Sequence, residues 1–91
     1  MQIKAAAIKT RDGEVHWILP PSRHHNVIWL LLSMGYSLCR ISYGEEGFIT
    51  DRDEFVSRAE ALTIARSSGQ LIQEHIELAE QLGELYSEFV W

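Results

Sequence analysis

Side chains that could serve in catalysis or bind a metal ion occur along the whole sequence, but none falls in a pattern typical of an active site. The chain has four histidines, thirteen aspartates and glutamates and a single cysteine, Cys39. His24 and His25 are adjacent, so on a helix they would point to different sides and could not both face one metal. No pair of histidines or cysteines has the spacing of a zinc site. The sequence therefore predicts a protein that is not an enzyme and that uses no metal and no cofactor.

Anion binding is the chemistry that the basic residues suggest best. Arg23, His24 and His25 open a predicted helix directly after Pro-Pro-Ser, and backbone amides at a helix start attract anions. The planar guanidinium of arginine suits a phosphate group. Arg58 stands in the first turn of a second predicted helix, where a cation opposes the helix dipole unless an anion or an acid offsets it. For Arg23, His24 and His25, the alternative is that they form an exposed basic helix cap that binds no ligand.

A small α+β fold must position these residues, and the length of 91 residues corresponds to a single domain, residues 1–91. The predicted strands cover 3–8, 15–19, 36–43 and a segment that starts at 48, reverses at 51–54 and returns at 55–56. The predicted helices cover 23–34, 58–68 and 71–83. We expect a small antiparallel sheet with two or three helices on one face, in the order β-β-α-β-β-α-α.

Local signals mark several boundaries of these elements. Asp12-Gly13 is a strong hairpin turn, and Gly44 to Gly47 is expected to form another turn. Ser22 is the expected N-cap of the first helix, and Ser57 with Glu60 has the pattern of a capping box. The first helix is apolar on more than one face, which predicts burial on most sides or a position in a subunit interface.

The charge distribution restricts the partners. The net charge is −5, and the last eighteen residues carry five glutamates and no basic residue. This excludes a broad face for DNA or RNA, which needs clustered positive charge, but leaves room for a local pocket with a few arginines. One cysteine allows no internal disulfide and suits the cytoplasm, and no apolar stretch approaches the ~20 residues of a membrane span. A chain this short gains stability from self-association, so a dimer or higher homo-oligomer is expected.

Several segments in their chain order resemble a family of short phage and prophage proteins that includes the anti-Thoeris sponges. They are Ala5 to Lys9, Arg23 to His25, Gly47 to Thr50, Phe55 to Ala61, Gly69-Gln70, Leu85 to Glu88 and Trp91. The resemblance implies a non-enzymatic homo-oligomer in the host cytoplasm that sequesters a cyclic ADP-ribose isomer, and cyclic oligonucleotides in some members. The expected ligand-binding residues are Arg23, His24, His25, Phe48, Arg58 and Gln70, with the Phe48 ring as a stacking platform for a base.

Two other functions fit the same residues. The first is a small phage-encoded inhibitor that binds a host protein directly, with the acidic face of 74–88 and the apolar tail 89–91 as its docking surface. The second is a small hydrolase that acts on a nucleotide and uses His24 or His16 as its base.

Overall fold

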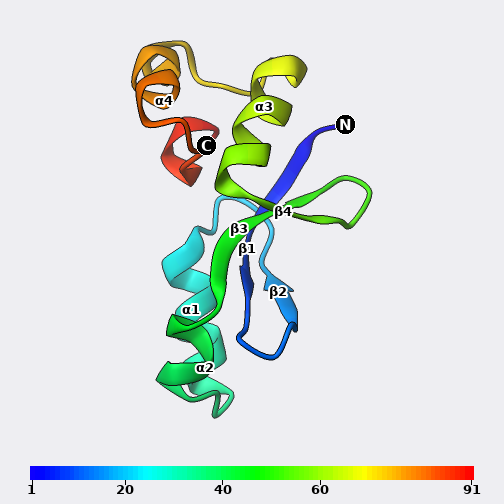
Figure 1. The fold of residues 1–91 in the computed structure, drawn as a ribbon, viewed down its shortest axis with the longest axis vertical. Coiled ribbons are helices and arrows are strands. Elements are labelled where there is room, and N and C mark those ends of the chain that lie inside the picture. The colour runs from blue at the N-terminus through cyan, green and yellow to red at the C-terminus, as the bar shows by residue number, and fades with distance from the viewer.

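Strand β1 is the centre of the fold. The computed structural model describes all residues from 1 to 91. The sheet has four strands in the order β2-β1-β3-β4, and every neighbouring pair is antiparallel. The strands are β1 (Ile3–Lys9), β2 (Val15–Trp17), β3 (Glu45–Thr50) and β4 (Phe55–Ser57). The helices are α1 (His24–Ser33), α2 (Leu38–Ser42), α3 (Arg58–Ser68) and α4 (Ile76–Leu82), with single turns of 3-10 helix at η1 (Gln73–His75) and η2 (Ser87–Phe89). The expected α+β class with an antiparallel sheet is therefore confirmed (Figure 1).

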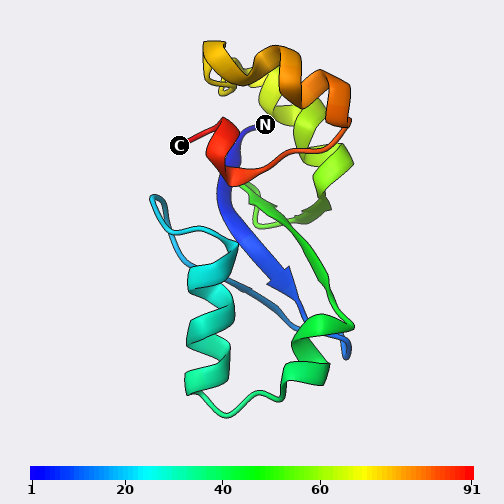
Figure 2. The same ribbon diagram turned by 90° about the vertical axis from the view of Figure 1, so that its left-hand side faces the viewer.

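The helices form two groups at opposite ends of an elongated molecule (Figure 2). Helices α1 and α2 enclose one buried cluster, which contains Ile8 of β1. Helix α3, helix α4 and the end of the chain enclose a larger cluster around Ala6 and Phe48. A third cluster, Ala5, Ala7 and Ile49, is covered by strand side chains and contains no helix residue. Because side chains alternate along β1, Ala6 and Ile8 face the helical groups, whereas Ala5 and Ala7 form the other face. The register shifts between Ile3 and Ala5, and Ile3 belongs to the larger helical cluster.

Two hairpins connect the strands as the sequence predicts. The first turns at Gly13, which has a φ of 92°, and the second turns at Asp53, with a φ of 59°. The predicted capping box is also present: the Ser57 hydroxyl accepts from the Glu60 amide and the Glu60 carboxylate accepts from the Ser57 amide, both at 3.1 Å. The first helix begins differently from the prediction. Its N-cap is Arg23 rather than Ser22, and the Asn26 side chain accepts from the Arg23 amide at 2.8 Å.

The predicted strand at 36–43 is wrong, because helix α2 occupies most of it. The Ser37 hydroxyl accepts from the Arg40 amide at 3.2 Å and so caps a one-turn helix. The alternation of residues in this segment does not reflect a half-buried strand, since only Ile41 is buried in α2 while Leu38 is exposed. A single local cap thus outweighs a short period-two pattern.

The predicted turn from Gly44 to Gly47 is also wrong, since strand β3 begins at Glu45 and includes Gly47. The glycine at position 47 is required by a close approach rather than by a turn. A Cβ there would lie 2.3 Å from the Val56 carbonyl oxygen and 2.5 Å from the Phe55 ring. The predicted helix at 71–83 is confirmed in part, because it is divided into η1 and the shorter α4, which ends at Gly83.

Helix α1 exposes much of its apolar surface. Only His24, Val27 and Leu31 are buried, whereas Trp29, Leu30 and Leu32 are exposed. The prediction of burial on most sides is therefore wrong for the single chain. None of the helices has the length and apolar character that a membrane crossing requires.

Candidate binding cleft

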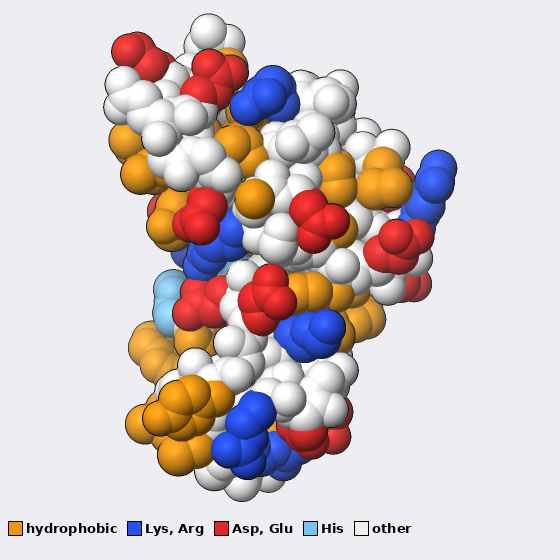
Figure 3. Space-filling view, in the orientation of Figure 1, with side chains coloured by type: hydrophobic (Ala, Val, Ile, Leu, Met, Phe, Trp, Pro, Cys, Tyr) orange, Lys and Arg blue, Asp and Glu red, His pale blue; other side chains and the backbone are white.

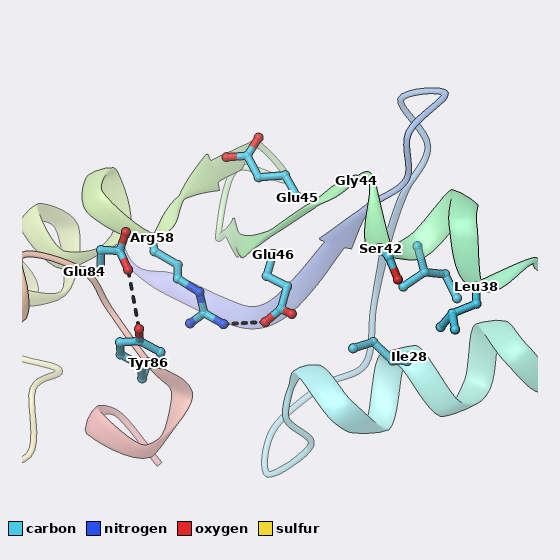
Figure 4. Close-up of a pocket in the computed structure, with 10 residues that line it drawn as sticks. Ile28, Leu38, Ser42, Gly44, Glu45, Glu46, Arg58, Glu84 and Tyr86 are labelled. Carbon is cyan, nitrogen blue, oxygen red and sulfur yellow. Dashed lines mark hydrogen bonds and ion pairs between the residues drawn. The ribbon is translucent and has the colours of Figure 1, made fainter.

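A cleft of about 630 Å³ lies between the two helical groups. It is lined by Ile28, Leu38, Ile41, Ser42, Gly44, Glu45, Glu46, Arg58, Glu84 and Tyr86. Figure 4 shows Ile28 and Leu38 at one end, Arg58 and Tyr86 at the other, and Glu46 between them. The cleft therefore joins an apolar end on α1 and α2 to a polar end formed by α3 and the segment before η2.

Arg58 crosses the polar end of the cleft, and both of its terminal nitrogens are engaged there. One terminal nitrogen donates to the Leu85 carbonyl oxygen at 2.9 Å, and the other donates to the Glu46 carboxylate at 2.5 Å. The guanidinium carbon lies 4.5 Å from the centre of the Tyr86 ring, in a cation-π arrangement. These contacts offset the unfavourable position of a cation in the first turn of α3. Arg58 thus connects β3, α3 and the end of the chain.

Carboxylates dominate the charge of the cleft. Glu45, Glu46 and Glu84 line it together with a single basic residue, Arg58. Glu46 is paired with Arg58, whereas Glu45 and Glu84 have no ion-pair partner. The Tyr86 hydroxyl donates to Glu84 at 3.5 Å. The cleft therefore carries excess negative charge and favours a cationic group over an anionic one.

Arg23 holds the end of the chain against the start of α1. Its guanidinium donates to the Ser87 hydroxyl at 3.3 Å, to the Glu88 carboxylate at 3.2 Å and to the main-chain oxygen of Trp91 at 2.6 Å. The Trp91 indole donates in turn to the Ser22 carbonyl oxygen at 3.1 Å, and Phe89 is part of the buried core. The apolar tail 89–91, which the alternative function would use as a docking surface, is therefore packed against the domain, with Phe89 buried and Val90 and Trp91 half-buried.

His24 and Phe48 lie together beneath the same chain end. The Nε2 atom of His24 is 2.7 Å from the Gly47 carbonyl oxygen, and its ring meets the edge of Phe48 at 5.0 Å between centres. Burial lowers the pKa of His24 from its ordinary value of 6.5, although the hydrogen bond to Gly47 acts in the opposite direction. Phe48 is fully buried. In this structure its ring therefore has no open face for a base.

His25 and Gln70 lie outside the cleft. His25 is exposed on α1, where its ring meets that of Trp29 at 5.0 Å between centres. The Gln70 side-chain amide pairs with the main chain of Ile3, donating to its carbonyl at 2.8 Å and accepting from its amide at 2.7 Å. Gln70 thus extends the hydrogen bonding at the start of β1. Of the six expected ligand-binding residues, only Arg58 lines the cleft.

A network of polar side chains fixes α2 against the β1–β2 hairpin. Arg40 of α2 donates to the Asp12 carboxylate at 2.8 Å, and the Tyr36 hydroxyl donates to Glu14 at 2.6 Å. The Thr10 hydroxyl and then Arg40 hold the pKa of Asp12 at about 2. This network holds α2, which carries Leu38, and directs the Arg40 guanidinium toward Asp12 and Glu14.

The buried His24 predicts a pH dependence of stability. Because the pKa of His24 is lower in the folded state, the unfolded chain takes up a proton first as the pH falls below about 6.5. The free energy of unfolding is therefore expected to decrease between pH 7.5 and pH 5.5, above the range in which the carboxylates titrate. Urea unfolding followed by circular dichroism measures this slope. His24→Gln removes the titrating group and should flatten it, so an equal slope in both proteins would show that another group is responsible.

Comparison with known proteins places the chain in a phage family. The family model described as the phage T4 y16D protein matches residues 2–91. No curated protein and no solved structure gave a significant match. This agrees with the expected relation to short phage proteins, and because the match spans nearly the entire sequence, the chain belongs to the phage T4 y16D protein family.

Proposed function

We propose that this phage protein acts without catalysis by binding a host protein through an apolar surface on α1 and α2. The α1–α2 patch, as we call this surface, consists of Ile28, Trp29, Leu32 and Leu38. Trp29 is 64% exposed and Leu38 is 63% exposed. Large contiguous apolar surface on a single chain is typical of an interaction site. This exposure is the observation that carries the proposal.

The members of the patch lie side by side. Ile28 and Leu38 both line the apolar end of the cleft, which brings α1 and α2 together there. Leu32 follows Ile28 by four positions and Trp29 by three, so on the surface of α1 it lies beside both of them. Figure 3 shows hydrophobic side chains gathered over α1 and α2, whereas charged side chains are frequent over the rest of that face.

Affinity capture from a bacterial lysate tests the proposal. Trp29→Asp and Leu38→Asp place a charge in the patch at exposed positions, where a substitution changes stability by about 0.5 kcal/mol or less. Leu82→Asp is the matched control, since Leu82 is an exposed leucine on α4. We expect discrete host proteins to be retained by the wild type and by the control but not by the patch variants. Equal capture by all four proteins would contradict the proposal.

Sequestration of a cyclic nucleotide is the second candidate function, and the size of the cleft supports it. A volume of about 630 Å³ is within the usual ~300–1,000 Å³ of small-molecule sites. Arg58 stacked over Tyr86 is also a pair that could receive a phosphate and a base. Against it, the cleft is lined by three carboxylates and one arginine, and this excess negative charge opposes the phosphates of such a ligand. For this reason we place protein binding first.

Calorimetric titration with cyclic ADP-ribose isomers and cyclic oligonucleotides separates the two candidates. Under sequestration, at least one nucleotide binds with nanomolar affinity, about −12 kcal/mol, and heating releases it unchanged, as chromatography would show. Arg58→Lys, which keeps the charge but loses the planar guanidinium, should then weaken binding. Absence of heat with every nucleotide would remove this candidate and leave protein binding.

A further inference from the structure

We propose that the α1–α2 patch and the acidic cleft beside it form one docking surface for a basic amphipathic segment of the partner. The apolar side chains of that segment cover the patch, and a lysine or arginine of the segment enters the cleft. This assignment rests on the proposed function and adds the chemistry of the partner. The contacts that carry it come from both helical groups.

The apolar half of the surface can be covered without burying an unpaired charge. Helix α1 contains no acidic, lysine or arginine residue along its length. The one basic residue of α2, Arg40, is held by Asp12 at 2.8 Å. Burial of Trp29, Leu32 and Leu38 therefore removes apolar area from water at little electrostatic cost. An amphipathic segment that presents leucine or similar side chains matches this half.

The acidic half sets the sign of the partner's charge. Glu45 and Glu84 are exposed and lack ion-pair partners, and Glu46 is the only carboxylate of the cleft that Arg58 neutralises. Figure 4 shows Glu46 between the apolar end and Arg58, and Glu84 beside Tyr86, whereas the Glu45 carboxylate points from the rim of the cleft to the other side of β3. A cation that follows the apolar anchors therefore meets carboxylates with free acceptor capacity. Such complementarity contributes mainly to specificity and to the rate of association.

A second copy of the chain fits this surface less well. In a symmetric contact each copy presents the same patch, so the carboxylates of two clefts would lie in one interface. Helix α1 supplies no lysine or arginine to neutralise them, and the Arg40 side chain of α2 is already paired with Asp12. The net charge of −5 adds to this repulsion. A partner that carries positive charge removes the conflict.

Fluorescence anisotropy with two labelled helical peptides tests this assignment on the full chain. One peptide combines leucine and lysine in an amphipathic pattern, and the other has glutamate in place of each lysine. We expect the leucine–lysine peptide to bind and the leucine–glutamate peptide not to bind. The double variant Glu45→Gln/Glu84→Gln should weaken binding at least tenfold, about 1.4 kcal/mol. The control Glu74→Gln/Glu77→Gln makes the same change in net charge on exposed residues outside the cleft and should bind as the wild type does.

Three results would overturn the assignment. The first is equal binding of both peptides, and the second is an equal effect of the cleft and control variants. The third is a wild-type dimer in light scattering that Trp29→Asp converts to a monomer, because a second copy would then occupy the surface. If host proteins are still captured in a patch-dependent manner while the peptides bind equally, protein binding stands and only the basic segment is refuted. If capture does not depend on the patch, the proposed function itself fails.

Discussion

Replacing Gly47 by alanine is expected to prevent the domain from folding. The added Cβ would lie 2.3 Å from the Val56 carbonyl oxygen, which is a main-chain atom of the neighbouring strand β4. It would also lie 2.5 Å from the Phe55 ring. Relief of both contacts requires β3 and β4 to separate at Gly47. The Gly47 carbonyl oxygen also lies 2.7 Å from the ring nitrogen of His24, so this hydrogen bond would be disturbed as well. The loss should approach the total stability of a domain this size, roughly 5–14 kcal/mol.

Circular dichroism and urea unfolding measure this effect. Gly83→Ala is a matched control, because Gly83 has a φ of 70° at the end of α4 and a Cβ there meets no atom within 4 Å. The control introduces only left-handed backbone strain, about 1–2 kcal/mol, and should stay folded. A folded Gly47→Ala with a cooperative transition close to that of the wild type would show that the strands can separate at this point without loss of the sheet.

Phe48→Ala is expected to lower the free energy of unfolding by about 3–5 kcal/mol, the usual cost of truncating a fully buried aromatic residue. Phe48 is the largest fully buried side chain, and it packs in the cluster beneath α3 and the chain end. Its ring also meets the edges of His24 and Trp91, at 5.0 and 6.3 Å between centres. The variant therefore leaves a cavity where strand β3, helix α1 and the end of the chain meet.

Urea unfolding again provides the measurement, and Trp29→Ala is the control for loss of an exposed aromatic ring. The control should change stability by about 0.5 kcal/mol or less. The experiment also addresses the expected role of Phe48 as a stacking platform. If Phe48→Ala kept full stability and lost nucleotide binding, the ring would be a ligand contact rather than a core residue.

The parts of the fold that local chemistry determines could be predicted from the sequence. The turn at Asp12-Gly13 and the capping box of Ser57 and Glu60 depend on residues within four positions of one another. Helix α2 could not be predicted in the same way, because two signals competed there. Alternation from Tyr36 to Tyr43 favoured a strand, whereas the cap at Ser37 favoured a helix that buries Ile41 against Ile8 and Val27.

The cleft depends on long-range contacts, and the sequence therefore indicated only one of its residues. Arg58 could be identified because a cation in the first turn of a helix requires an anion nearby. The anion is Glu46, twelve positions earlier, which the sequence placed in a turn rather than at the start of β3. Glu84 and Ile28 are far apart in the sequence and line the same cleft only when both helical groups pack on the sheet. No short sequence pattern predicts that these two residues line the same cleft.

The central position of β1 determines when this protein can fold during its synthesis. The first strand made has β3 as one of its neighbours, and the pairing of Ile3 with Thr50 requires half of the chain. Ile3 also shares its buried cluster with Leu85 and Phe89, which are translated more than eighty residues after it. Because contacts between distant segments are slow to form, this cluster closes late, and it cannot be completed before Phe89 has left the ribosome. The cluster of Ile8, Val27, Leu31 and Ile41 needs only the first half of the chain and can form earlier.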